Sequence, residues 1–209
     1  MECSVEWCHS ESKAKGFCNR HYLQDRYLGG IMKTRKDSSL VYDRGDYCEV
    51  ELFGNESNTA GHTKIDKEDE PLVSPYHWRI LAPRSGRYAI RNNHPTPIFM
   101  HHVIMGEKRE VDHINGDTLD NRKSNLRFCI RSENRFNVPK TSKTTKSQYK
   151  GVSSRRKGHG RLRWFAYITA YKNRKWVGTF DTQESAALAY NEAAKELHGE
   201  YACLNEVSA

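Results

Sequence analysis

The sequence predicts an α+β protein built of several small modules. Only 36% of its 209 residues are hydrophobic and 29% are charged, which is little material for one large core. Cysteines cluster near the N-terminus, and the C-terminal part has the pattern of three strands followed by a helix. We therefore expect modules at residues 1–30, 46–138 and 149–205, with a linker at 139–148 that is rich in Pro, Ser, Thr and Lys.

The charge of the chain points to a polyanionic partner. Its formal net charge is +8 and its pI is about 9.2. Between Asn134 and Phe180 there are thirteen lysines and arginines and no acidic residue. Such a one-sided run is typical of contacts with phosphates, although simple solubility is the alternative. No apolar run approaches the ~18 residues of a membrane helix, so the sequence predicts a cytoplasmic protein without a membrane partner.

The N-terminal module is expected to hold Zn²⁺. Its cysteines and histidine have the spacing C-x4-C-x9-C-x2-H. A segment of about thirty residues has too little core to fold without such a cross-link. His9 is a competing ligand, and three free thiols are the alternative to a site. The candidate tetrahedral ligands are Cys3, Cys8, Cys18 and His21.

The middle of the chain changes from helix to strand patterns. Residues 22–45 are polar and basic and predict a short helix and a linker, with a break at Gly29 and Gly30. From Tyr47, "YCEVELFG" alternates apolar residues with Glu49 and Glu51, as in a half-buried strand. The segments "HTKIDKEDEPLVSPYHWRIL", "RYAIR" and "PIFMHHVIMG" then predict short strands and turns that lead into a helix.

A polar stretch follows at 111–134, "VDHINGDTLDNRKSNLRFCIRSEN". It predicts strand, turn-rich loop, strand and short helix, with Leu126, Phe128 and Ile130 facing inward. Two interpretations of its many Asn and Asp residues are open. They could form a polar surface loop, because their side chains bond the nearby backbone, or a metal-assisted active site.

The C-terminal module predicts a three-stranded antiparallel sheet with one helix behind it. "YKGVSSR", "RWFAYITA" and "RKWVGTF" are the strands, and "DTQESAALAYNEAAKELHG" is the helix. Asp181 or Thr182 can cap the helix, Glu184 could complete a capping box with Asp181, and Gly199 ends it. Its small-residue stripe indicates close packing on the sheet and leaves the other sheet face open. The stripe consists of Ala186, Tyr190, Ala193, Ala194 and Leu197.

Two family resemblances follow from these motifs. "VDHINGDTLDNRKSNLRF", with Asn134 after it, resembles the core of an HNH endonuclease of the ββα-metal fold. The upstream "KIDKEDEPLV" and "MHHVIMG" resemble the leader of phage-type HNH homing endonucleases. "YKGV…RWFAYI…WVGTFDTQESAALAYNEAAKELHGEYACLN" is similar to an AP2 DNA-binding domain.

The HNH resemblance implies roles for four residues. Asp112 would be a hard oxygen ligand of Mg²⁺, and His113 the general base for phosphodiester hydrolysis. Asn125 would tie the loop and orient the histidine, and Asn134 would be the second metal ligand. The last "H" of the HNH pattern is Asn134 here, which favours Mg²⁺ or Mn²⁺ over tight zinc binding at this site.

The AP2 resemblance implies that the sheet enters the DNA major groove. Arginine can bind guanine by two hydrogen bonds, and both Lys and Arg hold phosphates. Trp176 is as consistent with a core position as with a DNA contact, and Trp164 is less so. Arg122, in the HNH-like loop, either supports the loop or touches a phosphate. The candidate DNA-binding residues are Arg122, Arg155, Arg156, Arg163, Trp164, Lys172, Arg174 and Trp176.

Other polar residues have structural interpretations first. Asn115, Asp117 and Asp120 are expected to form loop turns. His101 matches the leader histidine and favours a structural role, while the role of His102 is open. The acidic cluster, Asp66, Glu68 and Asp69, is expected to form a turn and cap instead of a metal site.

The sequence thus predicts a metal-dependent, homing-type DNA endonuclease, encoded by a phage and acting as a monomer on double-stranded DNA in the host cytoplasm. The alternative is a non-catalytic, sequence-specific DNA-binding regulator with a degenerate nuclease core. An RNA-binding protein is disfavoured by the AP2-like sheet. Cleavage of a plasmid with Mg²⁺, with and without EDTA, separates these hypotheses.

Overall fold

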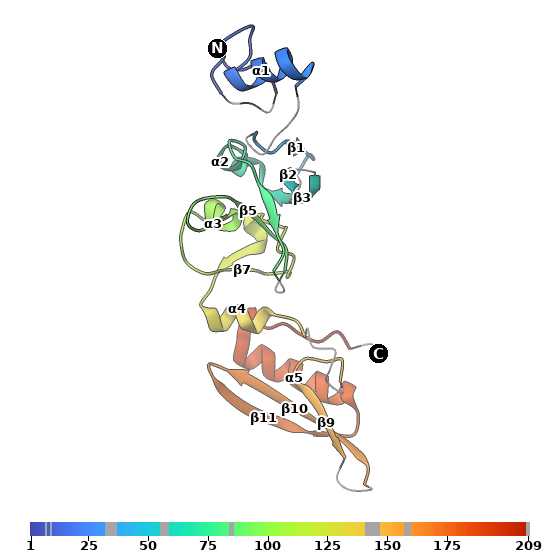
Figure 1. The fold of residues 1–209 in the computed structure, drawn as a ribbon. Helices are drawn as coiled ribbons and strands as arrows, with labels where there is room; N and C mark the ends of the chain where they lie inside the picture. Colours follow the sequence, from blue (N-terminus) through green and yellow to red (C-terminus); the bar gives the residue numbers. More distant parts are fainter. Residues whose placement is uncertain are drawn as a thin grey trace. The chain divides into compact units, whose positions relative to one another are not determined.

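The computed structural model describes residues 1–6, 8, 10–31, 37–54, 59–83, 86–140, 147–156 and 160–207. The chain divides into two compact units, Met1–Arg127 and Phe128–Ala209. Figure 1 shows their elements. The competing ligand His9 and the middle of the predicted linker lie outside the described residues. The predicted module boundaries stay predictions, but the short helix before the linker falls in the second unit.

The first unit begins with a helix after the third cysteine. Helix α1 (Asn19–Leu28) ends at Gly29, whose φ of 69° is left-handed, so the predicted break is confirmed. A six-stranded sheet follows in the order β1-β2-β4-β5-β6, with β3 paired to β2. Its strands are β1 (Val41–Asp43), β2 (Cys48–Phe53), β3 (Thr59–Ile65), β4 (Arg79–Leu81), β5 (Tyr88–Arg91) and β6 (Ile98–Phe99).

The core of the first unit forms around Trp78, which is fully buried. Its indole Nε1 donates to the carbonyl of Val73, 2.8 Å away, at the end of α2 (Glu70–Val73). Along β2 the predicted alternation is wrong at Glu51, which is buried instead of exposed. The backbone N–H of Leu40 lies 3.4 Å from the Glu51 carboxylate, beside the β1 edge. A backbone donor next to β1 thus partners the buried carboxylate.

The polar stretch folds in the predicted order. Helix α3 (Met100–Met105) leads to β7 (Val111–His113), a loop, β8 (Leu126–Phe128) and α4 (Arg131–Asn137). Strands β7 and β8 form a two-stranded sheet. Leu126 is buried as predicted, but Ile130 is 55% exposed. The strand ends at Phe128 and Ile130 becomes the N-cap of α4, so the period-2 alternation does not extend to it.

The second unit contains the predicted sheet and helix. Strands β9 (Val152–Arg156), β10 (Leu162–Ala170) and β11 (Asn173–Phe180) are antiparallel, with β10 in the centre. Helix α5 (Gln183–His198) packs on one face of this sheet (Figure 1). Thr182 is the N-cap and accepts from the N–H of Ser185. Asp181 instead pairs with Arg163, so the predicted box between Asp181 and Glu184 is not the cap that forms.

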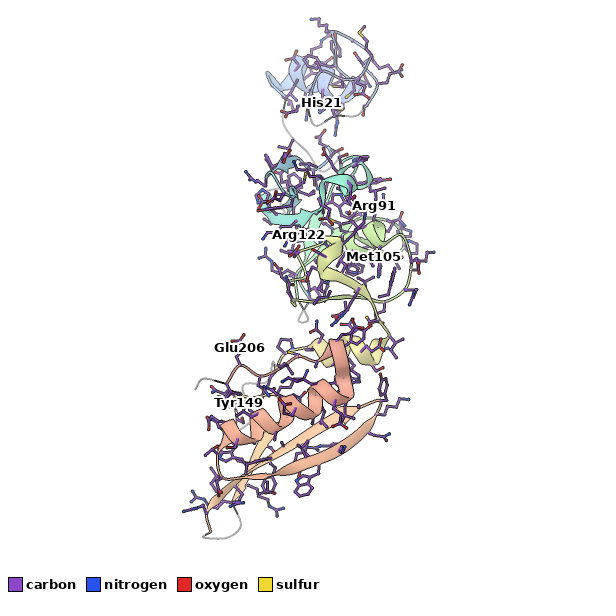
Figure 2. All side chains as sticks on the ribbon, turned by 180° about the vertical axis from the view of Figure 1, so that it is seen from behind. His21, Arg91, Met105, Arg122, Tyr149 and Glu206 are labelled. Carbon is purple, nitrogen blue, oxygen red and sulfur yellow. The ribbon has the colours of Figure 1, made fainter. Side chains whose placement is uncertain are left out.

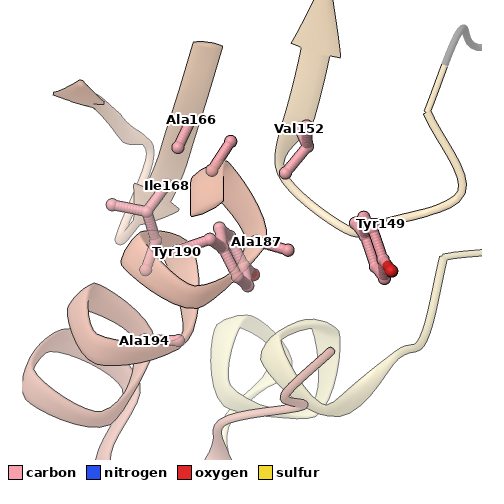
Figure 3. Close-up of a cluster of buried hydrophobic side chains, with 8 residues drawn as sticks. Tyr149, Val152, Ala166, Ile168, Ala187, Tyr190 and Ala194 are labelled. Carbon is pink, nitrogen blue, oxygen red and sulfur yellow. The ribbon is translucent and has the colours of Figure 1, made fainter. Parts of the chain in front are cut away.

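Small residues let α5 approach the sheet closely. Ala193 and Leu197 of the predicted stripe are only partly buried. Ala186 and Ala194 of the stripe are fully buried, as is the neighbouring Ala187. They pack with the aromatic ring of Tyr190 against β9 and β10 (Figure 3). The buried cluster is Tyr149, Val152, Ala166, Ile168, Ala186, Ala187, Tyr190 and Ala194.

Gly151 is expected to be essential for the stability of the second unit. Its φ is 73°, and an added Cβ would lie 2.2 Å from the Tyr190 ring and 2.6 Å from the carbonyl oxygen of Tyr167. Gly151→Ala should lower the free energy of unfolding by about 3 kcal/mol or more, because a rigid core must move. Gly199→Ala is the control, since Gly199 also has a positive φ but no atom within 4 Å of its Cβ. Equal losses in thermal unfolding would contradict the clash.

None of the helices in the described part of the chain is long and apolar enough to cross a membrane.

Candidate functional site

The N-terminal cysteines and His21 converge as predicted. Cys3, Cys8, Cys18 and His21 are all buried, and their ligand atoms lie within 4.8 Å of one another. Within the described residues, this is the only group of three or more His, Cys, Asp or Glu side chains arranged to hold a metal. The sulfurs of Cys8 and Cys18 are 3.8 Å apart. Tetrahedral zinc with ~2.3 Å Zn–S bonds requires a sulfur–sulfur distance of about 3.8 Å, so the cluster suggests a zinc site.

Asp37 fixes the orientation of the histidine ligand. The Nδ1 atom of His21 lies 3.3 Å from the sulfur of Cys3, and its Nε2 atom lies 3.1 Å from a carboxylate oxygen of Asp37. Asp37 is buried and also pairs with Arg20. A carboxylate that accepts from Nε2–H keeps the Nδ1 lone pair available for a metal. Nothing in the local spacing indicates Asp37, because it follows the last ligand by sixteen residues.

Zinc content tests the cluster. We expect about one zinc ion per chain after washing with EDTA, and less than a tenth of that in Cys8→Ser, because a structural tetrahedral site needs all four ligands. Cys203→Ser is the matched control, since Cys203 is partly exposed and distant from the cluster in sequence. Elemental analysis of the wild type, Cys8→Ser and Cys203→Ser measures their zinc content. A wild-type chain without zinc, with thiols that titrate freely in the native state, would refute the site.

The loop between β7 and β8 is held by its own Asn and Asp side chains. Asn125 accepts from the N–H of Asn115 (2.9 Å) and donates to the carbonyl of Asp120 (2.8 Å). Asp117 accepts from the N–H of Leu119 (3.0 Å). Asn115 likewise accepts from the N–H of Asp117 at 2.8 Å, so Asn115 and Asp117 form the expected turn interactions.

Arg122 takes part in the same framework. Its Nε and Nη2 atoms lie 2.8 and 2.7 Å from the two carboxylate oxygens of Asp120. This paired contact holds the pKa of the Asp120 carboxyl below its usual range. Arg122 is one of the side chains labelled in Figure 2. The structure thus supports the first of its two predicted roles, loop support.

The acidic cluster before α2 also anchors this loop. Asp66 accepts from the N–H of Lys123 at 2.7 Å. The ammonium of Lys123 lies 2.7 Å from Glu68 and 2.9 Å from Asp69. The cluster therefore works as a turn and an anchor, and the structure gives its carboxylates a cationic partner from the loop.

A chain of hydrogen bonds sets the ring of His113. The hydroxyl of Thr63 on β3 donates to the carbonyl of Leu119 (2.7 Å) and accepts from Nδ2 of Asn121 (2.7 Å). The amide oxygen of Asn121 therefore faces His113, 3.2 Å from its Nε2. An amide oxygen can only accept, so Nε2 carries the proton and Nδ1 carries the basic lone pair.

The buried His113 imidazole is thus neutral, with Nδ1 as its basic nitrogen. Burial lowers the pKa of its imidazole, which the Asn121 bond and nearby carboxylates partly oppose. The ring of His101 lies edge-on to it, with centroids 5.2 Å apart. Burial, and then the neighbouring His113 and His102, lower the pKa of His101 to about 3. His101 is therefore neutral and packs as an aromatic neighbour, which fits a structural role.

Asp112 is held by an arginine. Nε and Nη2 of Arg127 lie 2.9 and 2.6 Å from the Oδ2 atom of Asp112. Only 5% of the Asp112 side chain and 11% of the Arg127 side chain are exposed. Such a buried pair keeps the carboxylate in a fixed position on β7. His113 follows it directly on the strand, so the two side chains point to opposite sides.

The four predicted catalytic residues divide between the two units. Asp112, His113 and Asn125 belong to the first unit, and Asn134, on α4, belongs to the second. Joint metal binding by Asp112 and Asn134 therefore stays a prediction. Within the first unit, Asn121 hydrogen-bonds the His113 ring, whereas Asn125 bonds the loop backbone.

One face of the second sheet carries four of the eight predicted DNA-binding residues. Residues directly opposite each other on neighbouring strands point to the same face. Arg155 pairs with Arg163, and Tyr167 pairs with Trp176. Ala166 and Ile168 alternate with these on β10 and lie in the core below α5. The open face therefore presents Arg155, Arg163, Arg174 and Trp176.

The structure answers the open question for Trp176 and differs from the expectation for Trp164. Trp176 is 59% exposed, whereas Trp164 packs against the buried cluster. Trp164 is opposite Ser154 in the strand register, and Arg156 is opposite Leu162. These positions alternate with those of the open face, so Trp164 and Arg156 lie off that face. Lys172 is in the turn between β10 and β11. Strand register decides this distribution, and the sequence pattern alone could not fix it.

The polar stretch also matches known proteins. Residues 105–136 match the family model of the HNH endonucleases. This HNH segment starts at the end of α3, includes β7, the loop and β8, and ends on α4. His113, Asp112, Asn121 and Arg127 all lie in it.

Relatives of two kinds match the chain, a viral HNH endonuclease and plant proteins. An uncharacterised HNH endonuclease of Acanthamoeba polyphaga mimivirus is 28% identical over 185 residues, 84% of this chain and 89% of that protein. The ethylene-responsive transcription factor LEP of Arabidopsis thaliana is 42% identical over 72 residues, which is 32% of this chain and 34% of that protein. The dehydration-responsive element-binding protein 2D of the same plant is 48% identical over 59 residues, 27% of each chain.

The chain thus spans about a third or less of these two plant proteins. No solved structure matches the chain significantly. Together the HNH and plant matches support a nuclease with an AP2-like DNA-binding domain.

The sequence motifs did not indicate three of the residues that surround Asp112 and His113. Asn121 and Arg127 lie inside the HNH segment, and their spacing from His113 and Asp112 carries no periodic signal. Thr63 comes from a strand fifty-eight residues before its partner Asn121. Only the tertiary pairing of β3 with the loop brings it to the site.

Proposed function

We propose that this protein is a metal-dependent DNA endonuclease of the homing type, encoded by a virus or phage and acting as a monomer. The observation that carries the proposal is the bond chain from Thr63 through Asn121 to His113, which supports a neutral imidazole with its basic lone pair on Nδ1. A base of this kind can take a proton from a water that attacks a phosphodiester.

The oxygen donors fit a hard divalent cation. Asp112 offers a carboxylate and Asn134 an amide oxygen, the ligand types that Mg²⁺ and Mn²⁺ prefer. When bound, such an ion would stabilise negative charge on the phosphate oxygens. Arg127 keeps the Asp112 carboxylate oriented, and Asn121 keeps His113 in one tautomer. The hydrogen bonds of Asn125 and Arg122 stabilise the loop that carries Asn121.

DNA binding is assigned to the open face of the second sheet. Its arginines and exposed Trp176 suit the major groove of duplex DNA, by base contacts or by phosphate contacts. The names of the plant relatives denote transcription factors and element-binding proteins, which agrees with this role.

The direct test is nuclease activity. Purified protein incubated with supercoiled plasmid and Mg²⁺ should convert it to nicked or linear DNA, and EDTA should prevent this. Gel-shift with the same DNA in EDTA should still show binding. Binding without cleavage at any Mg²⁺ or Mn²⁺ concentration would instead support the alternative, a non-catalytic DNA-binding regulator.

A further inference from the structure

Helix α4 is packed against the module that follows it. The Phe136 ring stacks on the His198 ring at the end of α5, with centroids 3.9 Å apart and an interplanar angle of 7°. The ring of Tyr171 meets Phe136 edge-on, at 5.5 Å and 87°. Phe136 and His198 are 7% and 6% exposed, so the contact is part of the core of the second unit.

A lysine holds the C-terminal end of the same helix. The ammonium of Lys150 donates to the carbonyls of Phe136 (2.6 Å) and Val138 (2.7 Å). These are carbonyls that the end of a helix leaves without intrahelical partners, and a cation there also complements the helix dipole. Burial lowers the pKa of Lys150, as expected for an ammonium built into the structure instead of left in solvent.

The position of Lys150 is itself fixed by the C-terminal tail. Asn205 accepts from the N–H of Lys150 (2.6 Å) and donates to its carbonyl (3.1 Å). Asn191 on α5 bonds the backbone of Asn205 in both directions, at 2.7 and 2.9 Å. At the other end of the segment, the hydroxyl of Tyr201 donates to the carbonyl of Phe128 at 3.1 Å. The AP2-like module thus holds both ends of the segment that carries α4.

We propose that the AP2-like module positions Asn134 for the nuclease site, with Lys150 and Phe136 as the positioning residues. This rests on the proposed function, in which Asn134 is a metal ligand. Asn134 lies on α4 two residues before Phe136, whose ring and carbonyl are both held by the module. Through α4, the module that carries the open sheet face thus also sets the position of the proposed metal ligand.

The test uses the full chain and separates binding from cleavage. Lys150→Met keeps the aliphatic part of the side chain and removes the ammonium, and with it both hydrogen bonds to the end of α4. We expect kcat to fall about tenfold and the Mg²⁺ concentration for half-maximal cleavage to rise several-fold, the scale of losing charge-assisted hydrogen bonds. The Kd for DNA, measured by fluorescence anisotropy in EDTA, and KM should stay within twofold. Lys150→Arg should restore part of kcat.

Matched variants keep the outcome clear. Lys195→Met is the control, because Lys195 is an exposed lysine on α5 that pairs with Glu192. Phe136→Leu is a second probe, which removes the stacked ring and keeps an apolar side chain; it should shift kcat and the Mg²⁺ requirement in the same direction. The proposal is overturned if both variants cleave with wild-type kcat and Mg²⁺ dependence, or if each loses kcat only in proportion to lost DNA binding.

Asn134→Ala, assayed in parallel, separates the two levels of inference. If Asn134→Ala cleaves like the wild type, the metal-ligand role fails and the positioning role fails with it. If Asn134→Ala is inactive while Lys150→Met and Phe136→Leu are unaffected, the nuclease assignment stands and only the positioning role is wrong.

Discussion

Replacing His113 by alanine is expected to lower the cleavage rate by about 10²–10⁴-fold, the usual contribution of a general base. DNA affinity should not change, because His113 is buried in the first unit and the open sheet face proposed to bind DNA belongs to the second unit. Plasmid cleavage and gel-shift on the same preparation measure the two effects. The ring lies edge-on to those of Tyr88 and His101, and circular dichroism of the variant checks that its fold persists.

His62→Ala is the matched control for this variant. His62 is an exposed histidine on β3, next to Thr63, which is hydrogen-bonded to the Asn121 that contacts His113. It should cleave at nearly the wild-type rate. A His113→Ala protein that cleaves within tenfold of the wild type would exclude the general-base role.

Removal of two arginines from the open sheet face is the second large effect. Arg155→Ala with Arg174→Ala should weaken duplex DNA binding by about 30-fold or more, if each side chain contributes ~1 kcal/mol or more. If both contact phosphates, the slope of log affinity against log salt should flatten by ~0.9 per residue, about 1.8 together. Anisotropy titrations at several salt concentrations give both quantities. Arg163 is left in place because it forms an ion pair with Asp181.

Lys175→Ala with Lys195→Ala removes the same charge from the other side. Lys175 is opposite Ile168, a core residue, and so points toward the α5 side of the sheet. Lys195 is on α5 itself. This pair should cost much less affinity than the arginine pair. Equal losses would show that net charge, and not the open face, drives binding.

Local chemistry explains why several features were predictable from the chain alone. Gly29 and Gly199 end helices because glycine adopts the positive φ that closes them. The small-residue stripe of α5 has helical spacing, and the four zinc-ligand candidates lie close together in sequence. Asp112 and His113 are neighbours on one short strand, so a motif could identify them. In each case the residues that carry the signal lie close together in the sequence.

The tertiary structure decided what depends on residues far apart. Thr63 and Asn121 determine which nitrogen of His113 carries the proton, and Asp37 orients His21, through contacts that no spacing rule contains. The strand register of β10 and β11 placed Trp176 outside and Trp164 against the core. Most of all, α4 follows the HNH loop in sequence but is held by Lys150 and His198. Packing and hydrogen bonding act through space, so the physical partners of a helix need not be its neighbours along the chain.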